Sequence, residues 1–538
     1  VLTWTANSES DLASYKVYGG TSASPTTLLS TISAGTETYT NTSLTNGTAY
    51  YYRISAVDNN GNESSKSSDV SKVPWTADGN SVSGNISSNQ TWTEAGSPYT
   101  VTGNVLVNSG VTLTIEAGVT VKVNTSKVLQ INGALIAIGT SSDSIRFTSN
   151  QSNPSSGDWG YIKFSDSSID ASYDGDGNYS SGSIIKYCVV EYGGNTNGSI
   201  NIDSSHPYLK NSTIKNSAAS GIYLSNLNSH LKIKDCIIYQ NSTNGIFDTG
   251  DGHTLTITNC IISNNSSGIY YDTNQDGSDY LTVDNCTIKL NNNNGIYARV
   301  SCTMELKNNK IVENGIGIKF SSGCGNNNKI TENIIANNSG DGIVSWGGAG
   351  DAVEISNNRI ITNSGWGISI AGYLPGTADT KNNIVYNNGS GGIQSNFYGN
   401  NNSLLLLNNN HIVANNEKGL NTSVNTSAIN NLFISDEKHI YIHGTYTNFD
   451  INNNNLGRVL ETYSVYNSIS INIDAENNWW GTTTELDIQT QIYDFNDDGN
   501  LGTVDYSPYA SSLNTTAPIS PPTNVVMQQS GSNVVLSW

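Results

Sequence analysis

A run of acidic and amide residues close to residue 500 has the spacing of a calcium-binding loop. Side-chain oxygens fall at loop positions 1, 3, 5 and 12, and a glycine at position 6 permits the sharp bend of such loops. The residues are Asp494, Asn496, Asp498 and Asp505, with Gly499 at the bend. Aspartate at the last position has a shorter reach than the usual glutamate. We predict a Ca²⁺ site here, and the alternative is an acidic turn of a capping region.

Two further acidic loops share part of this spacing but have no ligand at the twelfth position. The first contains Asp272, Asn274, Asp276 and Asp279, and the second contains Asp174 and Asp176. Carboxylate and amide oxygens are the donors that Ca²⁺ prefers. Both loops are therefore weaker calcium candidates, and no motif in the chain predicts an organic cofactor.

Four aromatic residues recur in successive repeats, each directly after the isoleucine of a Gly-Ile pair. They are Tyr223, Phe247, Tyr270 and Tyr297. If that isoleucine points inward, the residue after it points outward, and the four rings form an exposed aromatic strip. Such a strip suits a glycan chain that lies along it. The alternative is an aromatic stack that only stiffens the sheet or packs against a loop.

Two basic residues, Arg299 and Lys319, fall beside this strip. A polysaccharide lyase needs a basic residue to remove a proton and a cation, often calcium, to neutralise a uronate carboxylate. A surface ion pair between Arg299 and Asp272 explains the same residues equally well. A glycoside hydrolase needs two carboxylates in one groove, and the repeat brings no such pair together. The sequence thus leaves enzymatic activity undecided and favours a protein that is not an enzyme.

A repeat between Tyr208 and Phe433 positions these candidates. Nine rungs, spaced 23–27 residues apart, align on one position. The aligned residues are Ser212, Cys236, Cys260, Cys286, Asn309, Asn333, Asn358, Asn383 and Asn410. Apolar residues alternate in short bursts, as at Leu255 and Ile257, and Asn, Asp, Ser or Gly separates the bursts. This pattern predicts about three short strands per rung, and hence an all-β solenoid, the parallel β-helix, with rungs of about 24 residues.

Asparagines are phased with the apolar positions of the repeat. One column lies five residues after the aligned position: Asn241, Asn265, Asn291, Asn314, Asn338, Asn363, Asn388 and Asn415. Amides in successive coils can hydrogen-bond to each other, so we predict an internal asparagine ladder here. Asn or Asp one residue before the aligned position predicts a second turn. The aligned position itself is predicted to join the apolar interior. A disordered low-complexity segment is the alternative, and the phasing argues against it.

Composition narrows the classes of protein that fit. The 538 residues carry a formal net charge of −20 and only 13% are charged, so a nucleic-acid partner is not expected. No apolar run predicts a membrane span, and Val1 does not begin a signal peptide, so a leader would precede it. Four of the six cysteines share the aligned inward position, and Cys302 with Cys324 is the one pair whose offsets suit a disulfide.

The coils before and after the regular rungs resemble a known family. "GNVLVNSGVTLTIEAGVTVKVN" near the start, and "NNWWG" with "DYSP" near the end, are similar to segments of bacterial extracellular right-handed parallel β-helix proteins. The resemblance implies a right-handed helix over residues 74–514 with a cap at each end. It also implies an extracellular or cell-surface location and makes a lyase or hydrolase acting on polysaccharides worth testing.

The two chain ends carry a different pattern. Residues 1–73, from "VLTWTANSESDLASYKVYGG" onward, resemble a fibronectin type III domain without its first strand, including the spacing from Leu44 to Tyr50 that the family uses for its tyrosine corner. Residues 515–538 form a Pro-rich linker followed by "NVVMQQSGSNVVLSW", which resembles the first strands of a further such domain. The predicted β-sandwich is therefore split across the two ends.

This split suggests that units join head to tail, either as tandem repeats of one chain or by strand addition between copies. The favoured function is an extracellular structural or adhesive rod that assembles with copies of itself into a filament or surface array. The alternative is a carbohydrate-binding or polysaccharide-degrading β-helix protein, with a polysaccharide as its partner.

Overall fold

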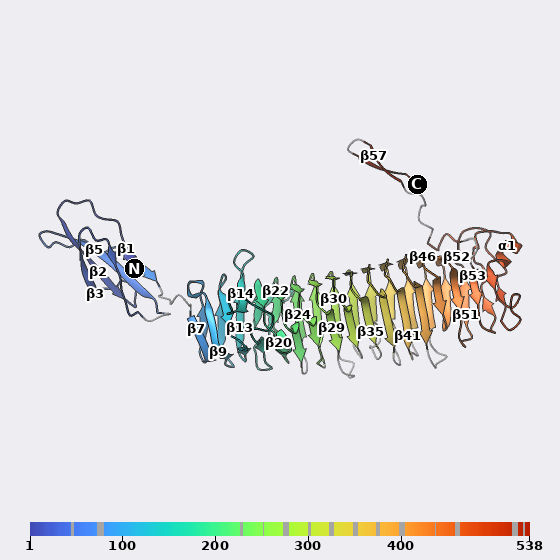
Figure 1. The fold of residues 1–538 in the computed structure, drawn as a ribbon, viewed down its shortest axis with the longest axis horizontal. Coiled ribbons are helices and arrows are strands. Elements are labelled where there is room, and N and C mark those ends of the chain that lie inside the picture. Colours follow the sequence, from blue (N-terminus) through green and yellow to red (C-terminus); the bar gives the residue numbers. More distant parts are fainter. Residues whose placement is uncertain are drawn as a thin grey trace.

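The computed structural model describes residues 1–44, 48–72, 80–225, 230–250, 252–272, 279–299, 303–321, 328–347, 353–372, 377–397, 404–435, 437–457, 463–518, 526–530 and 533–537. Figure 1 shows a long solenoid of stacked strands, preceded by a small domain of antiparallel strands and followed by a hairpin. No helix in the described part of the chain is long and apolar enough to span a membrane.

One rung of the solenoid illustrates the rest. It contains β27 (Thr254–Thr258), β28 (Ile261–Ser263) and β29 (Ser267–Asp272), and each pairs in parallel with its counterpart in the next rung. Those counterparts are β30 (Tyr280–Asp284), β31 (Thr287–Lys289) and β32 (Asn294–Arg299). Because the parallel pairing repeats rung after rung, the predicted parallel β-solenoid with three strands per rung is confirmed.

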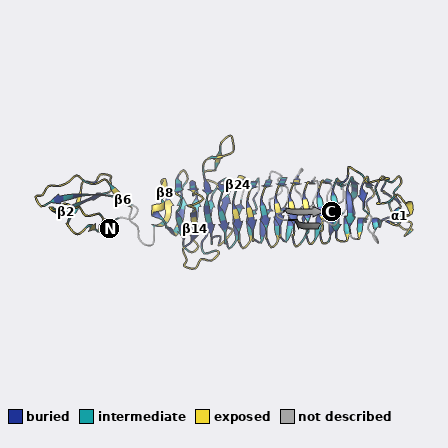
Figure 2. Cartoon of the chain, turned by 90° about the horizontal axis from the view of Figure 1, so that it is seen from above, coloured by how far each residue is buried: buried dark blue, intermediate teal, exposed yellow. Residues whose placement is uncertain are grey.

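The interior of the solenoid is one continuous apolar core that runs from Ile86 to Val504. Leu255, Ile257, Ile262 and Ile269 are all fully buried, as the alternation in the sequence predicts. Figure 2 shows buried, intermediate and exposed residues along the stacked strands. Removal of these side chains from water supplies the main driving force for coiling.

The asparagine ladder predicted five residues after the aligned position is confirmed. The side-chain Nδ2 of Asn241 donates to Oδ1 of Asn265 at 3.0 Å, and the same bond recurs in successive rungs until Asn388 donates to Asn415 at 2.9 Å. The backbone N–H of each residue donates to the same oxygen, as from Asn291 to Asn314 at 3.1 Å. Every buried amide at this turn is therefore satisfied by the rung beside it.

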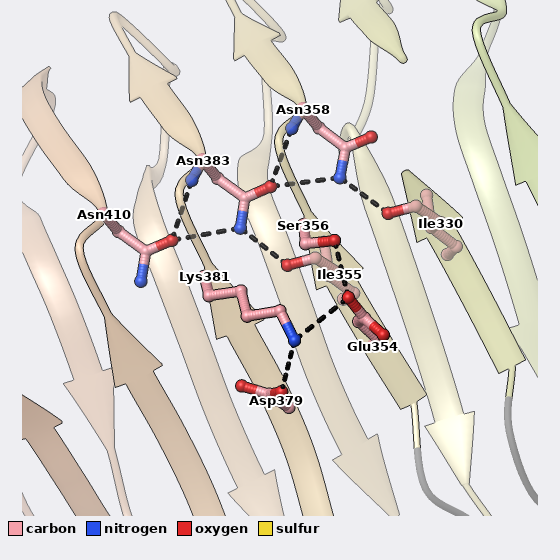
Figure 3. A network of polar contacts seen from close by, with 9 residues as sticks. All are labelled: Ile330, Glu354, Ile355, Ser356, Asn358, Asp379, Lys381, Asn383 and Asn410. Atoms are coloured by element: carbon pink, nitrogen blue, oxygen red, sulfur yellow. Dashed lines mark hydrogen bonds and ion pairs between the residues drawn. The ribbon is translucent and has the colours of Figure 1, made fainter. Parts of the chain in front are cut away.

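A second ladder occupies the aligned position, where the prediction of an apolar interior is wrong. From Asn309 to Asn478 the side chains form an unbroken series of amide bonds, of which Figure 3 shows Asn358, Asn383 and Asn410. In earlier rungs a serine or cysteine accepts the same backbone N–H: Cys236 donates to Sγ of Cys260 at 3.4 Å. The residues at the aligned position thus share a side-chain atom that accepts a hydrogen bond, because the turn leaves one buried backbone N–H in each rung that needs an acceptor.

The residues just before the aligned position adopt the left-handed backbone conformation. Asp235, Asn259, Asn285 and Asn308 have φ between 53° and 57°, which confirms the predicted second turn. Asparagine and aspartate tolerate this conformation better than most residues. The four described cysteines, Cys188, Cys236, Cys260 and Cys286, are buried and unpaired, whereas Cys302 and Cys324 lie outside the described residues.

The ladder also explains the glycine in each Gly-Ile pair. A Cβ at Gly245 would lie 2.6 Å from the carbonyl oxygen of Gly268 and 3.0 Å from Nδ2 of Asn265. Where the ladder ends at Asn415, a histidine, His439, takes the glycine position and Ser435 follows in the asparagine column. His439 is fully buried, and among the described residues neither of its ring nitrogens has a hydrogen-bond partner.

Burial lowers the pKa of His439 from 6.5 to about 4, because the charged ring would lose its hydration. Above pH 6.5 both folded and unfolded chains hold a neutral ring; as the pH falls below 6.5 only the unfolded chain gains the proton. We therefore expect His439 to contribute a loss of about 3 kcal/mol of stability between pH 6.5 and pH 4. Urea denaturation across this range should show a shallower pH dependence for His439→Leu than for the wild type. Parallel pH profiles would contradict the assignment.

The last coils of the solenoid are followed by a short helix. Helix α1 (Glu485–Gln489) follows the fully buried Trp480, which covers the last coil. The side chain of Ile488 is also fully buried, so the helix closes the open end of the core.

The N-terminal domain consists of two antiparallel sheets. β1 (Leu2–Thr3) pairs with β4 (Thr38–Tyr39), and the other sheet has the order β3-β2-β5-β6, with β2 (Leu12–Gly20) and β5 (Tyr50–Asp58) at its centre. β3 spans Leu28–Ser33 and β6 spans Val70–Lys72. The C-terminal strands β57 (Val526–Ser530) and β58 (Asn533–Ser537) form an antiparallel hairpin. The fibronectin type III assignment and the three domain boundaries stay predictions.

Candidate functional site

The four predicted aromatic residues lie in one column on the outer face of the solenoid. They come from β23 (Ser220–Ser225), β26 (Asn244–Asp248), β29 and β32, and the strand register places each directly beside the next. Ring centroids are 5.6 Å apart for Tyr223 and Phe247, 5.1 Å for Phe247 and Tyr270, and 4.5 Å for Tyr270 and Tyr297. All four are partly exposed, so the strip has the predicted geometry.

The rings are not equivalent. Tyr270 and Tyr297 are stacked with an interplanar angle of 24°, so each covers part of the other's face. Phe247 and Tyr270 meet edge to face at 64°. The change of orientation lies beside a shallow pocket of about 560 Å³, which both residues line. The sequence predicts the column, but ring tilt depends on packing between rungs and could not be read from it.

Amides and hydroxyls make up most of the remaining lining of this pocket, together with Gly315 and Ile316. The amides and hydroxyls belong to Asn244, Ser266, Ser267, Asn292, Asn293 and Asn294. Nδ2 of Asn293 donates to Oγ of Ser266 at 2.9 Å, which links two of these lining side chains. Burial and the nearby Asp272 charge raise the pKa of Tyr270 to about 12, so its hydroxyl stays a hydrogen-bond donor. An aromatic wall with several polar groups around it is typical of a small-molecule or glycan site.

The two basic candidates lie at the C-terminal side of the strip. Nε of Arg299 lies 2.6 Å from Oδ1 of Asp272, and Nζ of Lys319 lies 5.9 Å from the ring centroid of Tyr297. The charge of Asp272, together with its hydrogen bond, raises the pKa of Arg299, which therefore remains a cation and a poor base. The arrangement suits charge recognition, and the catalytic role of these two residues stays a prediction.

The loop after Asp272 is only partly described, because Asn274 and Asp276 lie outside the described residues. Asp279 is buried, and its carboxylate accepts the backbone N–H of His253 at 2.7 Å. Nδ1 of His253 lies 2.5 Å from Oδ1 of Asp248, and both side chains are fully buried. This buried polar cluster sits inside the solenoid, and sequence reasoning missed Asp248 and His253. Asp174, by contrast, is an exposed turn residue that accepts the N–H of Asp176.

The predicted calcium loop near residue 500 folds into a hydrogen-bonded turn. Oδ1 of Asp494 accepts the N–H of Asn496 at 2.9 Å, and Oδ2 accepts the N–H of Val504 at 2.8 Å. Asp498 accepts the N–H of Asn500 at 3.0 Å, and Asp505 accepts that of Ser507 at 3.3 Å. These bonds show how the loop is held, and its calcium site stays a prediction.

A shallow pocket of about 520 Å³ brings three of the loop residues together, namely Asp494, Asn496 and Asp505. Asp474 and Glu476 line it as well, and sequence reasoning missed both because they come from a different, irregular rung. Across the described residues, no group of three or more His, Cys, Asp or Glu side chains is arranged to hold a metal ion.

Three family models, two of them described as β-helix families, match parts of the chain, in keeping with its parallel β-solenoid. Residues 162–345 match the family model described as periplasmic copper-binding protein (NosD), residues 273–456 match the right handed beta helix region, and residues 84–205 match the pectate-lyase like beta helix domain. No single match spans half of the chain. No curated protein sequence matches the chain significantly.

Three of the solved structures that match the chain are an alginate epimerase, a catalytic domain and a pectate lyase, all at low identity. A double mutant of the periplasmic alginate epimerase AlgG has 14% identity and a TM-score of 0.31, over 73% of this chain and 77% of that one. The Agl-KA catalytic domain has 13% identity and a TM-score of 0.34, over 74% and 63%. Pectate lyase Pel9A has 14% identity and a TM-score of 0.21, over 65% and 72%.

Proposed function

We propose that this protein binds a linear polysaccharide on the outer face that Phe247 and Tyr270 build, at the cell surface or elsewhere outside the cytoplasm. The observation that carries the proposal is the pocket beside these two rings, with amide and hydroxyl groups along its rim. The C–H faces of a sugar ring can pack on the aromatic rings, and its hydroxyls can hydrogen-bond to the amide and hydroxyl groups of the pocket. The match to a pectate-lyase like domain and to a family described as periplasmic supports the ligand class and the location.

Charge on this face supports the same proposal. The chain has a net charge of −20, yet Arg299 and Lys319 both flank the aromatic strip. Because Asp272 compensates the charge of Arg299, Lys319 is the cation of this face that can meet a carboxylate of an acidic glycan, and the amides and hydroxyls of the pocket suit neutral glycans as well. The open, shallow form of the pocket suits a chain that passes over it.

Metal-assisted chemistry is not assigned. Copper is named in one family description, but among the described residues no group of three or more His, Cys, Asp or Glu side chains is arranged to hold a metal ion, and the described thiols are buried in the solenoid core. The loop from Asp494 to Asp505 has oxygen donors of the kind calcium prefers, and calcium there is proposed as a stabiliser of the cap.

A structural role is a second candidate, because the solenoid has one uninterrupted core from Ile86 to Val504 and two continuous amide series along it. A rod of this kind, joined head to tail with copies of itself through its end segments, would form a filament or surface array. The two functions are compatible, since a rod can present a glycan-binding face along its length.

The double variant Phe247→Ala/Tyr270→Ala tests the proposed site. We expect it to weaken glycan binding about tenfold to a hundredfold, because each aromatic contact is worth roughly 1 kcal/mol or somewhat more. Affinity electrophoresis and calorimetry with alginate, polygalacturonate and the neutral glucan laminarin would measure this. The exposed Tyr386→Ala, on a different strand column, is the matched control. Unchanged binding of every glycan would contradict the site, and release of unsaturated products or reducing ends would show cleavage as well.

A further inference from the structure

The column that carries the aromatic strip continues along the solenoid. Strand register leads from Tyr297 through Lys319, Val344, Ser369, Gln394 and Asn421 to Tyr441, Tyr466 and Tyr493. The last three residues therefore lie on the same outer face as Phe247 and Tyr270. Sequence reasoning stopped at Phe433, where the rungs become irregular, and so missed them.

These residues form a second group of packed rings, which we call the C-terminal aromatic cluster: Tyr441, Tyr463, Tyr466 and Tyr493. Tyr466 and Tyr493 stack at 4.3 Å with an interplanar angle of 5°, and Tyr441 lies 5.4 Å from Tyr466. Tyr463 meets Tyr466 and Tyr493 edge to face at 5.4 Å and 5.5 Å. All four are partly exposed.

Two lysines flank the cluster. Nζ of Lys418 lies 5.3 Å from the ring centroid of Tyr441, and Nζ of Lys438 lies 5.3 Å from that of Tyr466. The first aromatic strip is similar, with one lysine, Lys319, beside Tyr297. Neighbouring inward residues, such as Ile440 and Val465, are fully buried, so the outward rings are not needed to fill the core. The same chemistry thus recurs at two places on one face of an acidic protein.

The distance between the two places is set by the rungs. Six rung steps separate Tyr297 from Tyr441, which at about 4.8 Å per step is about 29 Å. In the column between them Val344 and Ser369 are buried, whereas Gln394 and Asn421 are partly exposed. No bulky ring interrupts this stretch of the column.

We propose that the C-terminal aromatic cluster is a second contact for the same polysaccharide, so that one long chain spans both sites along the axis of the solenoid. This inference rests on the proposed function and adds a second site and a direction to it. Binding at one site makes the second contact intramolecular, so a chain long enough to reach both binds more tightly than either site alone. A fragment shorter than the gap can occupy only one site at a time.

Calorimetry with size-fractionated alginate and laminarin tests this, on the full chain, with fragments well below and well above about 29 Å. For short fragments we expect a binding stoichiometry of two fragments per wild-type chain. Either double variant, Tyr441→Ala/Tyr466→Ala or Phe247→Ala/Tyr270→Ala, should bind one fragment per chain. For the long fragments, either double variant should raise the dissociation constant about a hundredfold. Tyr386→Ala should leave both readouts unchanged, and circular dichroism would verify that each variant is folded.

The outcomes separate this inference from the proposed function. One short fragment per wild-type chain, with Tyr441→Ala/Tyr466→Ala binding long fragments like the wild type, would overturn the second site and leave the first intact. If only Tyr441→Ala/Tyr466→Ala lost binding, both the proposal that one glycan spans the two sites and the proposed site at Phe247 would be wrong. Two short fragments per chain without any gain in affinity for long ones would overturn the bridging.

Discussion

Asp248→Ala is expected to lower the free energy of unfolding by about 3–5 kcal/mol, the usual effect of removing one partner from a buried pair. Oδ1 of Asp248 lies 2.5 Å from Nδ1 of His253, and neither side chain is exposed to solvent. Without the carboxylate, the imidazole keeps its polar ring nitrogen in the core while its acceptor is gone. The substitution also leaves a small cavity, which adds to the loss.

Equilibrium urea denaturation followed by circular dichroism would measure the change. Asp166→Ala is the matched control, because Asp166 is exposed; it should change stability by less than about 0.5 kcal/mol. The double variant Asp248→Leu/His253→Leu should recover part of the loss, since the imidazole is no longer left without its carboxylate, although the N–H of Gly250 still loses the Asp248 acceptor that it has at 3.2 Å. Equal effects of Asp248→Ala and Asp166→Ala would show that the pair contributes nothing.

Asn314→Leu should have an effect of similar size, on the order of 4 kcal/mol, because it leaves several buried groups without partners at roughly 1–3 kcal/mol each. Oδ1 of Asn314 accepts from the backbone and side chain of Asn291 at 3.1 Å and 2.9 Å. Its Nδ2 donates to the carbonyl oxygens of Ile288 and Val312, both at 3.0 Å. Leucine has nearly the same size but can make none of these bonds.

The control is Asn416→Leu, at an exposed turn position directly after the last asparagine of the same column. Its side chain makes a single bond, to the carbonyl oxygen of Gly389 at 2.9 Å. The melting temperature should therefore fall clearly for Asn314→Leu and little for Asn416→Leu. A similar small shift in both would mean that the ladder does not stabilise the solenoid.

Much of the solenoid could be predicted because its residues repeat in phase. The alternation at Leu255 and Ile257 and the Gly-Ile pairs predict which side chains point inward, and these side chains are buried. The column from Asn241 to Asn415 predicts a ladder of amide hydrogen bonds, and the structure contains it. The aligned column was misjudged for a physical reason. Ser212 and Cys260 have apolar or small side chains that suit a core, and only the turn geometry shows that their Oγ and Sγ accept a buried N–H.

The site was predicted in part. The outward phase of Tyr223, Phe247, Tyr270 and Tyr297 follows from the repeat, whereas ring tilt and the pocket beside Phe247 depend on contacts between rungs. The acidic pocket that joins Asp474 to Asp494 could not be predicted, because irregular rungs give no register to extend. The Asp248–His253 pair was missed because polar residues in the interior are exceptions to the apolar pattern.

The asparagine ladder at the aligned position tolerates rungs of different length. Its consecutive members are 27 residues apart between Asn383 and Asn410 but 21 apart between Asn410 and Asn431, and the amide bond is 3.0 Å in both cases. Rungs of this chain therefore differ in length by six residues while their amides stay in line. A duplicated turn would bring its own acceptor and its own donor and would fit between any two existing turns. Rod length is thus free to drift by whole turns, whereas a single lost amide interrupts the series.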